Sequence, residues 1–164
     1  MLLIPKTRFS RIHMIGIGGS GMSGLAEILH SIGFEVSGSD ISRKDTTERL
    51  ERLGIKVFYG HRAENVGGAN IVVYSSAIGP DNPELVRAKE LKIPIIQRAE
   101  MLAELMRVKF SIAVSGAHGK STTTSMIGHI LKEVGKNPTV IVGGILKDVG
   151  SGGLVGRGEY LVAE

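Results

Sequence analysis

Short apolar runs rich in β-branched residues alternate along the chain with longer amphipathic stretches. The apolar runs predict strands and the amphipathic stretches predict helices. In the first two thirds of the chain, strands are expected at 12–15, 35–39, 56–59, 71–74 and 93–97, and helices at 22–32, 46–53, 83–91 and 99–107. The run 71–74 is apolar throughout, as is typical of a parallel strand covered on both faces. This alternation predicts an α/β fold with a doubly wound parallel sheet.

The same pattern then restarts. A buried strand is expected at 110–114, a helix at 121–134, and further strands at 139–142 and 160–163. Gly33, Gly54 and Gly135 each follow a predicted helix, where a C-terminal glycine belongs. We therefore place a first domain at 1–107 and the beginning of a second α/β domain at 108–164. No Pro/Gly linker marks the boundary, and the second unit has too few elements for a core of its own, so we expect it to be truncated.

Composition narrows the possible roles. The chain is 42% hydrophobic and 22% charged, which is typical of a folded protein, and it has no cysteine for disulfides or thiolate metal sites. The segment 1–4 ends at Pro5, too short for a signal-peptide core, and no apolar run approaches the roughly 20 residues of a membrane helix. A net charge of +4 with only 4% aromatic residues does not favour nucleic-acid binding. We expect a cytoplasmic protein with neither a membrane nor a nucleic-acid partner.

A first glycine loop joins the first predicted strand to the first helix. Residues 16–21 read Gly-Ile-Gly-Gly-Ser-Gly, which fits G-x-G-x-x-G. In a Rossmann-like domain such a loop lets backbone N–H groups approach a diphosphate at a helix N-terminus. Asp40 follows about 20 residues later, at the end of the second strand, where an acid can accept a hydrogen bond from a ribose hydroxyl. The alternatives are a tight turn without a ligand and Asp40 as a turn or capping residue; these residues alone do not exclude NAD.

A second glycine loop opens the helix at 121–134. Residues 115–122 read Ser-Gly-Ala-His-Gly-Lys-Ser-Thr. Lys120 can reach the β- and γ-phosphates of a nucleotide, the Ser121 hydroxyl can ligate Mg²⁺, and the loop amides can hold the phosphates. His118 is expected near phosphate as a loop residue. The general phosphate loop has a glycine where this chain has Val114, so the loop is a shorter form, G-x-x-G-K-S.

The two loops together resemble the Mur ligase family. The second loop fits G-[TA]-x-G-K-[ST]-[ST], which Mur ligases share with folylpolyglutamate synthetases, but the folate enzymes lack the N-terminal nucleotide-sugar domain. The segments 15–24, 37–40, 60–61, 75–78 and 98–102 resemble those of the alanine-adding Mur ligases. The resemblance covers essentially the whole chain. It implies a Rossmann-like domain for a UDP-sugar, followed by the start of a P-loop-type α/β ATPase domain.

The resemblance also implies a reaction and its residues. Alanine-adding members use ATP and Mg²⁺ to join L-alanine to the lactoyl carboxylate of UDP-N-acetylmuramate through an acyl phosphate. Lys120 is then the catalytic residue for γ-phosphate charge, and Ser121 and Glu164 are the metal ligands. ATP is implied to bind at Gly116, Ala117, His118, Gly119, Lys120, Ser121 and Thr122. The UDP-sugar is implied to bind at Gly18, Gly19, Ser20, Gly21, Asp40, His61, Ser76 and Arg98.

Several alternatives stay open at this point. His61 and Ser76 also fit a turn and a helix cap, Arg98 has Glu100 as a candidate salt-bridge partner, and Glu164 can be an ordinary acid. The competing functions are a murein peptide ligase of wall recycling, an NAD-dependent oxidoreductase and a non-catalytic nucleotide-binding module. We expect this chain alone to bind the UDP-sugar without turnover. The oligomeric state and the choice of amino acid are not predicted.

Overall fold

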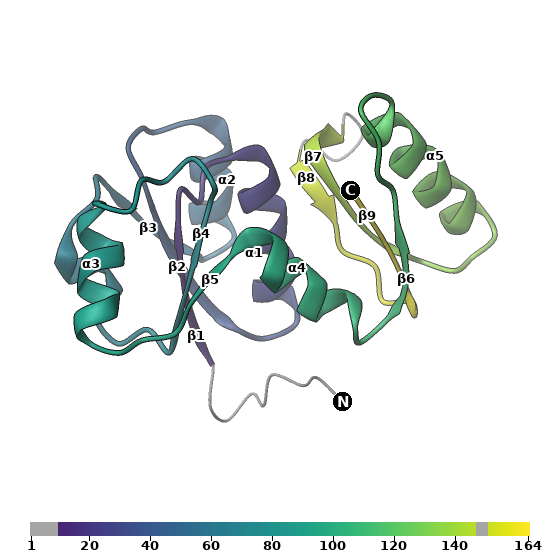
Figure 1. The fold of residues 1–164 in the computed structure, drawn as a ribbon. Helices are drawn as coiled ribbons and strands as arrows, with labels where there is room; N and C mark the ends of the chain where they lie inside the picture. Colours follow the sequence, from purple (N-terminus) through teal and green to yellow (C-terminus); the bar gives the residue numbers. More distant parts are fainter. Residues whose placement is uncertain (1–9, 147–150) are drawn as a thin grey trace.

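A computed structural model describes residues 10–146 and 151–164 of the chain (Figure 1). Residues 1–5, which we judge too short for a signal-peptide core, lie outside the described residues. The fold is α/β, with a five-stranded parallel sheet followed by a second, mixed sheet of four strands. In the described part of the chain, no helix is both long and apolar enough to span a membrane.

The first sheet has the strand order β3-β2-β1-β4-β5, and all of its pairings are parallel. Its strands are β1 (Arg11–Ile15), β2 (Glu35–Asp40), β3 (Lys56–Tyr59), β4 (Ile71–Tyr74) and β5 (Ile95–Gln97). They are connected by α1 (Ser20–Ser31), α2 (Asp45–Arg52), the 3₁₀ helix η1 (Ala63–Val66) and α3 (Pro83–Glu90), and α4 (Arg98–Met106) follows β5. From β1 the chain runs outward through β2 to β3 at one edge of the sheet, and it then crosses back to β4 on the other side of β1. Ligands of such sheets bind where the strand order reverses, at the carboxyl ends of the strands.

Side chains of the central strands alternate between two buried clusters. Ile12 and Met14 of β1 belong to the larger cluster, with residues of α1, α2 and α4. Ile15 of β1 and Val72 of β4 point the other way and pack with Val66 of η1 and with α3. The sheet is therefore covered on both faces, as the apolar run at 71–74 predicts.

The second sheet has the order β6-β9-β7-β8. Its strands are β6 (Phe110–Ala113), β7 (Thr139–Leu146), β8 (Ser151–Leu154) and β9 (Tyr160–Ala163), and its helix is α5 (Lys120–Glu133). The β6, β9 and β7 strands are parallel, whereas β8 pairs antiparallel with β7 across an irregularity between Ile141 and Leu146. One face of this sheet meets α5, where a Cβ added to Gly128 would lie 2.7 Å from Val140.

The other face of the second sheet packs on α1. Ile141, Leu161 and Ala163 belong to the same buried cluster as the core of the first sheet. Figure 1 shows α1 between the two sheets, and all residues from Met22 to Leu29 are buried. A helix buried on all sides needs an apolar or small residue at nearly every position, which this segment supplies. The second unit thus completes its core with a helix of the first.

Most predicted elements are present within two residues of their expected ends. The three predicted C-terminal glycines have positive φ angles of +95° at Gly33, +87° at Gly54 and +76° at Gly135. The expectation of a buried strand at 110–114 is wrong: Phe110 is 68% exposed and all four β6 residues are exposed. β6 is an edge strand that pairs with β9, while α5 packs over β7 and β9. Two elements, η1 and β8, were not predicted.

Candidate functional site

The first glycine loop lies at the reversal point of the first sheet. It follows β1, and the N–H groups of Gly16 and Ile17 donate to the Ser39 carbonyl of β2 at 2.8 and 3.0 Å. Gly16 has φ +78°, which permits the sharp turn away from the strand. Gly19, the residue before α1, has no side chain that could cap the helix, so the first N–H groups of α1 are left without a side-chain capping partner.

Asp40 holds this loop in place. One of its carboxylate oxygens accepts the Gly18 N–H at 3.0 Å. The other accepts the Ser42 N–H at 3.2 Å and lies 3.5 Å from Lys44 Nζ. Asp40 is only 4% exposed. The turn-residue alternative is therefore present in the structure, and any ribose contact made by Asp40 has to share oxygens already bound by the loop.

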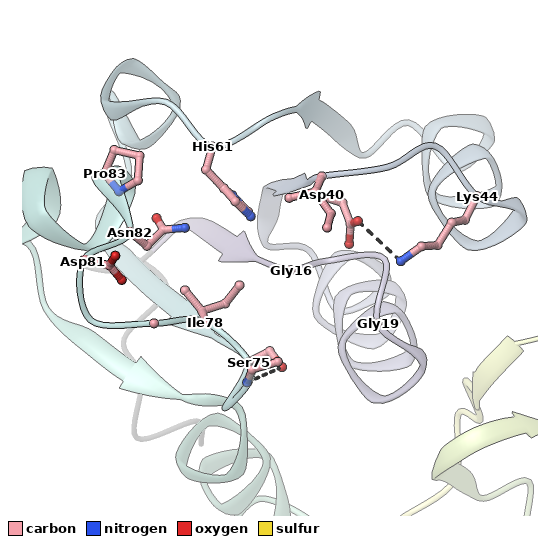
Figure 2. A pocket seen from close by; sticks show the side chains of 13 residues that line it. Gly16, Gly19, Asp40, Lys44, His61, Ser75, Ile78, Asp81, Asn82 and Pro83 are labelled. Atoms are coloured by element: carbon pink, nitrogen blue, oxygen red, sulfur yellow. Dashed lines mark hydrogen bonds and ion pairs between the residues drawn. The ribbon is translucent and has the colours of Figure 1, made fainter.

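A cavity of about 520 Å³ opens beside the loop (Figure 2). Its walls come from four segments: the glycine loop, the end of β2, the loop after β3 and the loop after β4. The lining residues are Gly16, Gly19, Asp40, Ile41, Lys44, His61, Ser75, Ala77, Ile78, Gly79, Asp81, Asn82 and Pro83. The lining is mostly apolar with a few polar groups, which suits a nucleoside, and the adjoining N-terminus of α1 suits the phosphates attached to it.

The structure distributes the predicted sugar-nucleotide residues unevenly. Gly19, Asp40 and His61 line the cavity, whereas Ser76 lines a separate depression of about 290 Å³ beyond Ile78. Its neighbour Ser75 faces the cavity instead. Sequence analysis also missed Lys44, whose Nζ points toward Asp40 at the cavity wall (Figure 2).

Arg98 approaches the glycine loop from α4. A Cβ added to Gly21 would lie 3.0 Å from Arg98 Nη1, so the guanidinium rests directly on the start of α1. Nη1 is buried and has no hydrogen-bond partner among the described residues. The alternative of an Arg98–Glu100 salt bridge is not found among the ion pairs of the described residues; Glu100 instead accepts the Gln97 N–H at 2.6 Å. A buried, unpartnered guanidinium nitrogen beside a glycine loop suits an anionic ligand.

Beneath the cavity lies a buried carboxylate that sequence analysis missed. Glu84 of α3 is fully buried and accepts hydrogen bonds from Ser39 Oγ at 2.7 Å and Asn65 Nδ2 at 2.6 Å, and it lies 3.2 Å from His13 Nε2. Burial raises the pKa of Glu84, but the hydrogen bonds from His13, Ser39 and Asn65 outweigh it and hold the pKa below its ordinary value of 4.5. Glu84 is therefore an anion at neutral pH, and it lies 3.5 Å from Nδ1 of the cavity residue His61.

The second glycine loop opens α5. Gly119 adopts φ +79° immediately before the helix, and Lys120 is the first helical residue. Lys120 Nζ donates to the Gly116 carbonyl at 2.7 Å, across the loop. The predicted ATP-binding residues Ala117, His118 and Thr122 are exposed. An exposed loop with a left-handed glycine and a lysine at a helix N-terminus has the features of a phosphate site.

Glu164 follows β9 and faces this loop. Its Oε1 accepts the Ser121 hydroxyl at 2.6 Å and the Gly143 N–H at 2.5 Å. Its Oε2 is buried without a partner among the described residues. The carbonyl of the same Gly143 accepts the hydroxyl of Ser20, so this residue of β7 contacts the first glycine loop directly and the second through Glu164.

The two predicted metal ligands, Ser121 and Glu164, are thus brought together. The described residues contain no cluster of three or more His, Asp or Glu side chains able to hold a metal ion. A Mg²⁺ ion at this position would need nucleotide phosphate oxygens and water to complete its shell, which is how Mg²⁺ is usually bound beside phosphates. The unpartnered Oε2 of Glu164 fits such an ion.

Comparison with known proteins identifies a family. A family model described as the Mur ligase family, catalytic domain, matches residues 11–110. The chain is 57% identical over 159 residues to the UDP-N-acetylmuramate–L-alanine ligases of Sulfurihydrogenibium sp. and of Aquifex aeolicus. Each match covers 97% of this chain and 35% of the relative, so the chain spans about a third of the length of these proteins.

Solved structures show the same similarity. The UDP-N-acetylmuramate–alanine ligase of Thermotoga maritima superposes with a TM-score of 0.87 at 38% identity, over 93% of this chain and 36% of that one. The UDP-N-acetylmuramate:L-alanyl-γ-D-glutamyl-meso-diaminopimelate ligase of Neisseria meningitides gives a TM-score of 0.86 at 31% identity, over 95% of this chain and 52% of that one.

Proposed function

The chain belongs to the Mur ligase family, and on this premise we propose that it forms part of an ATP-dependent ligase joining L-alanine to UDP-N-acetylmuramate. In this proposal, residues 1–107 form a Rossmann-like, doubly wound domain that binds the UDP-sugar. Residues 108–164 begin a P-loop-type domain that binds ATP. The setting is cytoplasmic synthesis of peptidoglycan precursors.

One observation supports the proposal above all. Two glycine loops each open a helix after a parallel strand, and Gly143 links them, because it contacts Ser20 directly and Ser121 through Glu164. One loop adjoins a cavity large enough for a nucleotide, and the other presents Lys120 and Ser121. A ligase that activates a carboxylate needs both a site for the carboxylate substrate and a site for the triphosphate that activates it.

The chemistry assigns a task to each group. A carboxylate is a poor acyl donor, so an oxygen of the lactoyl carboxylate attacks the γ-phosphorus of ATP and ADP leaves. The amino group of L-alanine then attacks the acyl carbon, and the tetrahedral intermediate expels inorganic phosphate. Lys120 balances charge on the γ-phosphate, and the amides of residues 116–119 hold the phosphate chain. Ser121 and Glu164 would hold Mg²⁺, which neutralises phosphate charge when bound.

In the first domain, the proposal assigns the UDP-sugar to the glycine loop and the adjoining cavity. The N–H groups of Ser20 and Gly21 at the start of α1 serve the diphosphate, with Arg98 beside them. Gly19 shapes the loop by donating its N–H to the Gly16 carbonyl at 3.1 Å. His61 serves the nucleoside side of the cavity, and Asp40 supports the loop through Gly18. Ser76 stays a weaker assignment because it lines a separate depression.

Titration and turnover test the proposal together. We expect UDP-N-acetylmuramate to bind this chain in calorimetry, and the intact protein to release phosphate from ATP only when both UDP-N-acetylmuramate and L-alanine are present. NAD serves as the control ligand for the oxidoreductase alternative, which the family match disfavours. Phosphate release that depends on a tripeptide instead of L-alanine would favour the murein peptide ligase, the function of the 31% identical structural relative. Amide synthesis that survives Lys120→Ala would refute the proposal.

A further inference from the structure

The buried Glu84 carboxylate determines which of the groups around it donate a hydrogen bond, because an ionised carboxylate can only accept. On its Oε1 side the donors are fixed: the Arg62 N–H at 3.3 Å and the Asn65 amide at 2.6 Å, which also donates to the Gly60 carbonyl. On its Oε2 side the neighbours can rearrange: the Ser39 hydroxyl at 2.7 Å and His13 Nε2 at 3.2 Å. Hydroxyls and neutral imidazoles can each donate or accept, but backbone and side-chain amide N–H groups only donate.

The same arrangement of donors and acceptors extends from Glu84 and Ser39 to His61, which lines the cavity. Ser39 has a single hydroxyl proton, and at 2.7 Å that proton goes to ionised Glu84. Toward His61 Nδ1, 3.1 Å away, Ser39 Oγ can then only accept. Glu84 Oε1, 3.5 Å from the same nitrogen, is also an acceptor. Ser39 Oγ, the hydrogen-bonded neighbour of Nδ1, therefore requires a proton on Nδ1, and the more distant carboxylate favours the same tautomer.

The other ring nitrogen then has a defined character. In a neutral imidazole with a proton on Nδ1, Nε2 carries a lone pair and can only accept a hydrogen bond. His61 lines the cavity with Asp40 and Asn82, and Figure 2 shows its ring extending into the space between them. Glu84 and Ser39 do not line the cavity. Their side chains therefore reach the cavity through His61 and do not contact a ligand there directly.

We propose that Glu84 and Ser39 are positioning residues that hold His61 as its Nδ1–H tautomer, so that Nε2 accepts a hydrogen bond from the bound nucleotide. The partner is a donor group of a uridine nucleotide, either a ribose hydroxyl or the uracil N3–H. A phosphate oxygen is excluded as the partner because it has no proton to offer. The inference rests on the proposed function for the identity of the nucleotide, but the tautomer is a property of the protein alone.

Substitution of Glu84 by glutamine tests the proton order. The new amide nitrogen cannot face Arg62 N–H and Asn65, which only donate, so it faces Ser39 and His13. It then donates to Ser39 Oγ, which frees the hydroxyl proton to turn toward His61 Nδ1. We expect His61 to change from the Nδ1–H to the Nε2–H tautomer in Glu84→Gln. Long-range proton–nitrogen NMR of nitrogen-15 histidine-labelled protein reports this change directly.

The matched control is Glu90→Gln on the same helix, where the carboxylate is exposed and pairs with Arg87. It should leave the His61 signals unchanged. If Glu84→Gln does not fold, Ser39→Ala supplies the second variant and should give His61 mixed tautomers. A wild-type spectrum with the proton on Nε2, or on both nitrogens, would overturn the proposal without any variant. So would an unchanged tautomer in folded Glu84→Gln.

Binding of nucleotide analogues to the intact protein identifies the donor. We expect UDP to bind wild type about 5- to 10-fold more tightly than one of 2′-deoxy-UDP, 3′-deoxy-UDP or N3-methyl-UDP, which is the loss expected for one hydrogen bond. In Glu84→Gln that ratio should fall to about one. Equal affinity of wild type for all four ligands would overturn the assigned partner. Absence of UDP binding would refute the proposed function instead, while the tautomer measurement would still stand.

Discussion

Gly24 in α1 offers a direct test of how the two sheets are joined. A Cβ added at this position would lie 2.5 Å from the Gly152 carbonyl carbon and 2.9 Å from the Gly153 nitrogen of β8. These atoms are backbone on both sides and cannot rotate away as a side chain can. Gly24→Ala therefore requires α1 and β8 to separate by roughly 1 Å to restore ordinary contact.

Two opposing effects set the size of the change. Alanine is favoured over glycine within a helix by about 1 kcal/mol. Overpacking of a close-packed site costs about 1–3 kcal/mol, and a contact between rigid backbones belongs in the upper half of that range. We expect Gly24→Ala to lower the free energy of unfolding by about 1–2 kcal/mol, and the melting temperature by roughly 2–8 °C for a chain of this size. Urea denaturation followed by circular dichroism measures the change.

Gly21→Ala is the matched control in the same helix. Its added Cβ would meet Arg98 Nη1 at 3.0 Å, the far end of a flexible side chain that can move aside. Its unfolding free energy should be unchanged or raised by up to about 1 kcal/mol. If Gly24→Ala were as stable as Gly21→Ala, β8 would not pack against α1, and the shared core of the two sheets would be wrong.

Further predictions concern single charged residues. Lys120→Met in the intact protein should lower alanine-dependent phosphate release by roughly 10²–10³-fold with little change in stability, because it removes charge from the γ-phosphate site. The lowered pKa of Glu84 means that its stabilisation is present above pH 4.5 and is lost as the pH falls through the lower folded value. Glu84→Gln should therefore flatten the acid side of a stability–pH profile. Lys109 donates to the Gly158 carbonyl at 2.8 Å and to Thr139 at 3.1 Å. Lys109→Met should cost about 1–3 kcal/mol in urea denaturation, whereas exposed Lys132→Met should cost almost nothing.

The sequence predicts the fold well where the signal is local. β3, β4 and β9 have the expected bounds because each is a short apolar run with clear limits. β8 was missed because Ser151–Leu154 is half glycine, and its pairing with β7 depends on a distant segment. The exposure of β6 was missed for a related reason. An apolar run does not reveal whether its strand is at the centre or the edge of a sheet.

In the candidate site too, residues in local motifs were predicted and residues brought together from distant segments were not. Both glycine loops and Lys120 are contiguous motifs, so their spacing alone identified them. Glu84 follows Asn82 and Pro83 at a helix start, where an acidic residue is ordinary, so no local pattern distinguishes it. It meets His13 because α3 packs on the face of the sheet that carries this residue of β1, and it meets His61 because parallel strands bring their loops to one edge of the sheet.

Gly143 shows why residues between the motifs matter as much as the motifs. Its carbonyl accepts the hydroxyl of Ser20 in the first glycine loop, and its N–H donates to Glu164, which accepts the hydroxyl of Ser121 beside the second. Gly143 lies in the stretch between Ile141 and Leu146 where the pairing of β7 with β8 is irregular, so its N–H and carbonyl are available to residues outside the sheet. A Cβ at Gly143 would lie 3.2 Å from Glu164 Oε1 and crowd the carboxylate that holds Ser121. A side chain at this position would therefore push the Glu164 carboxylate by a few tenths of an ångström away from the Ser121 hydroxyl and the Gly143 N–H that it accepts.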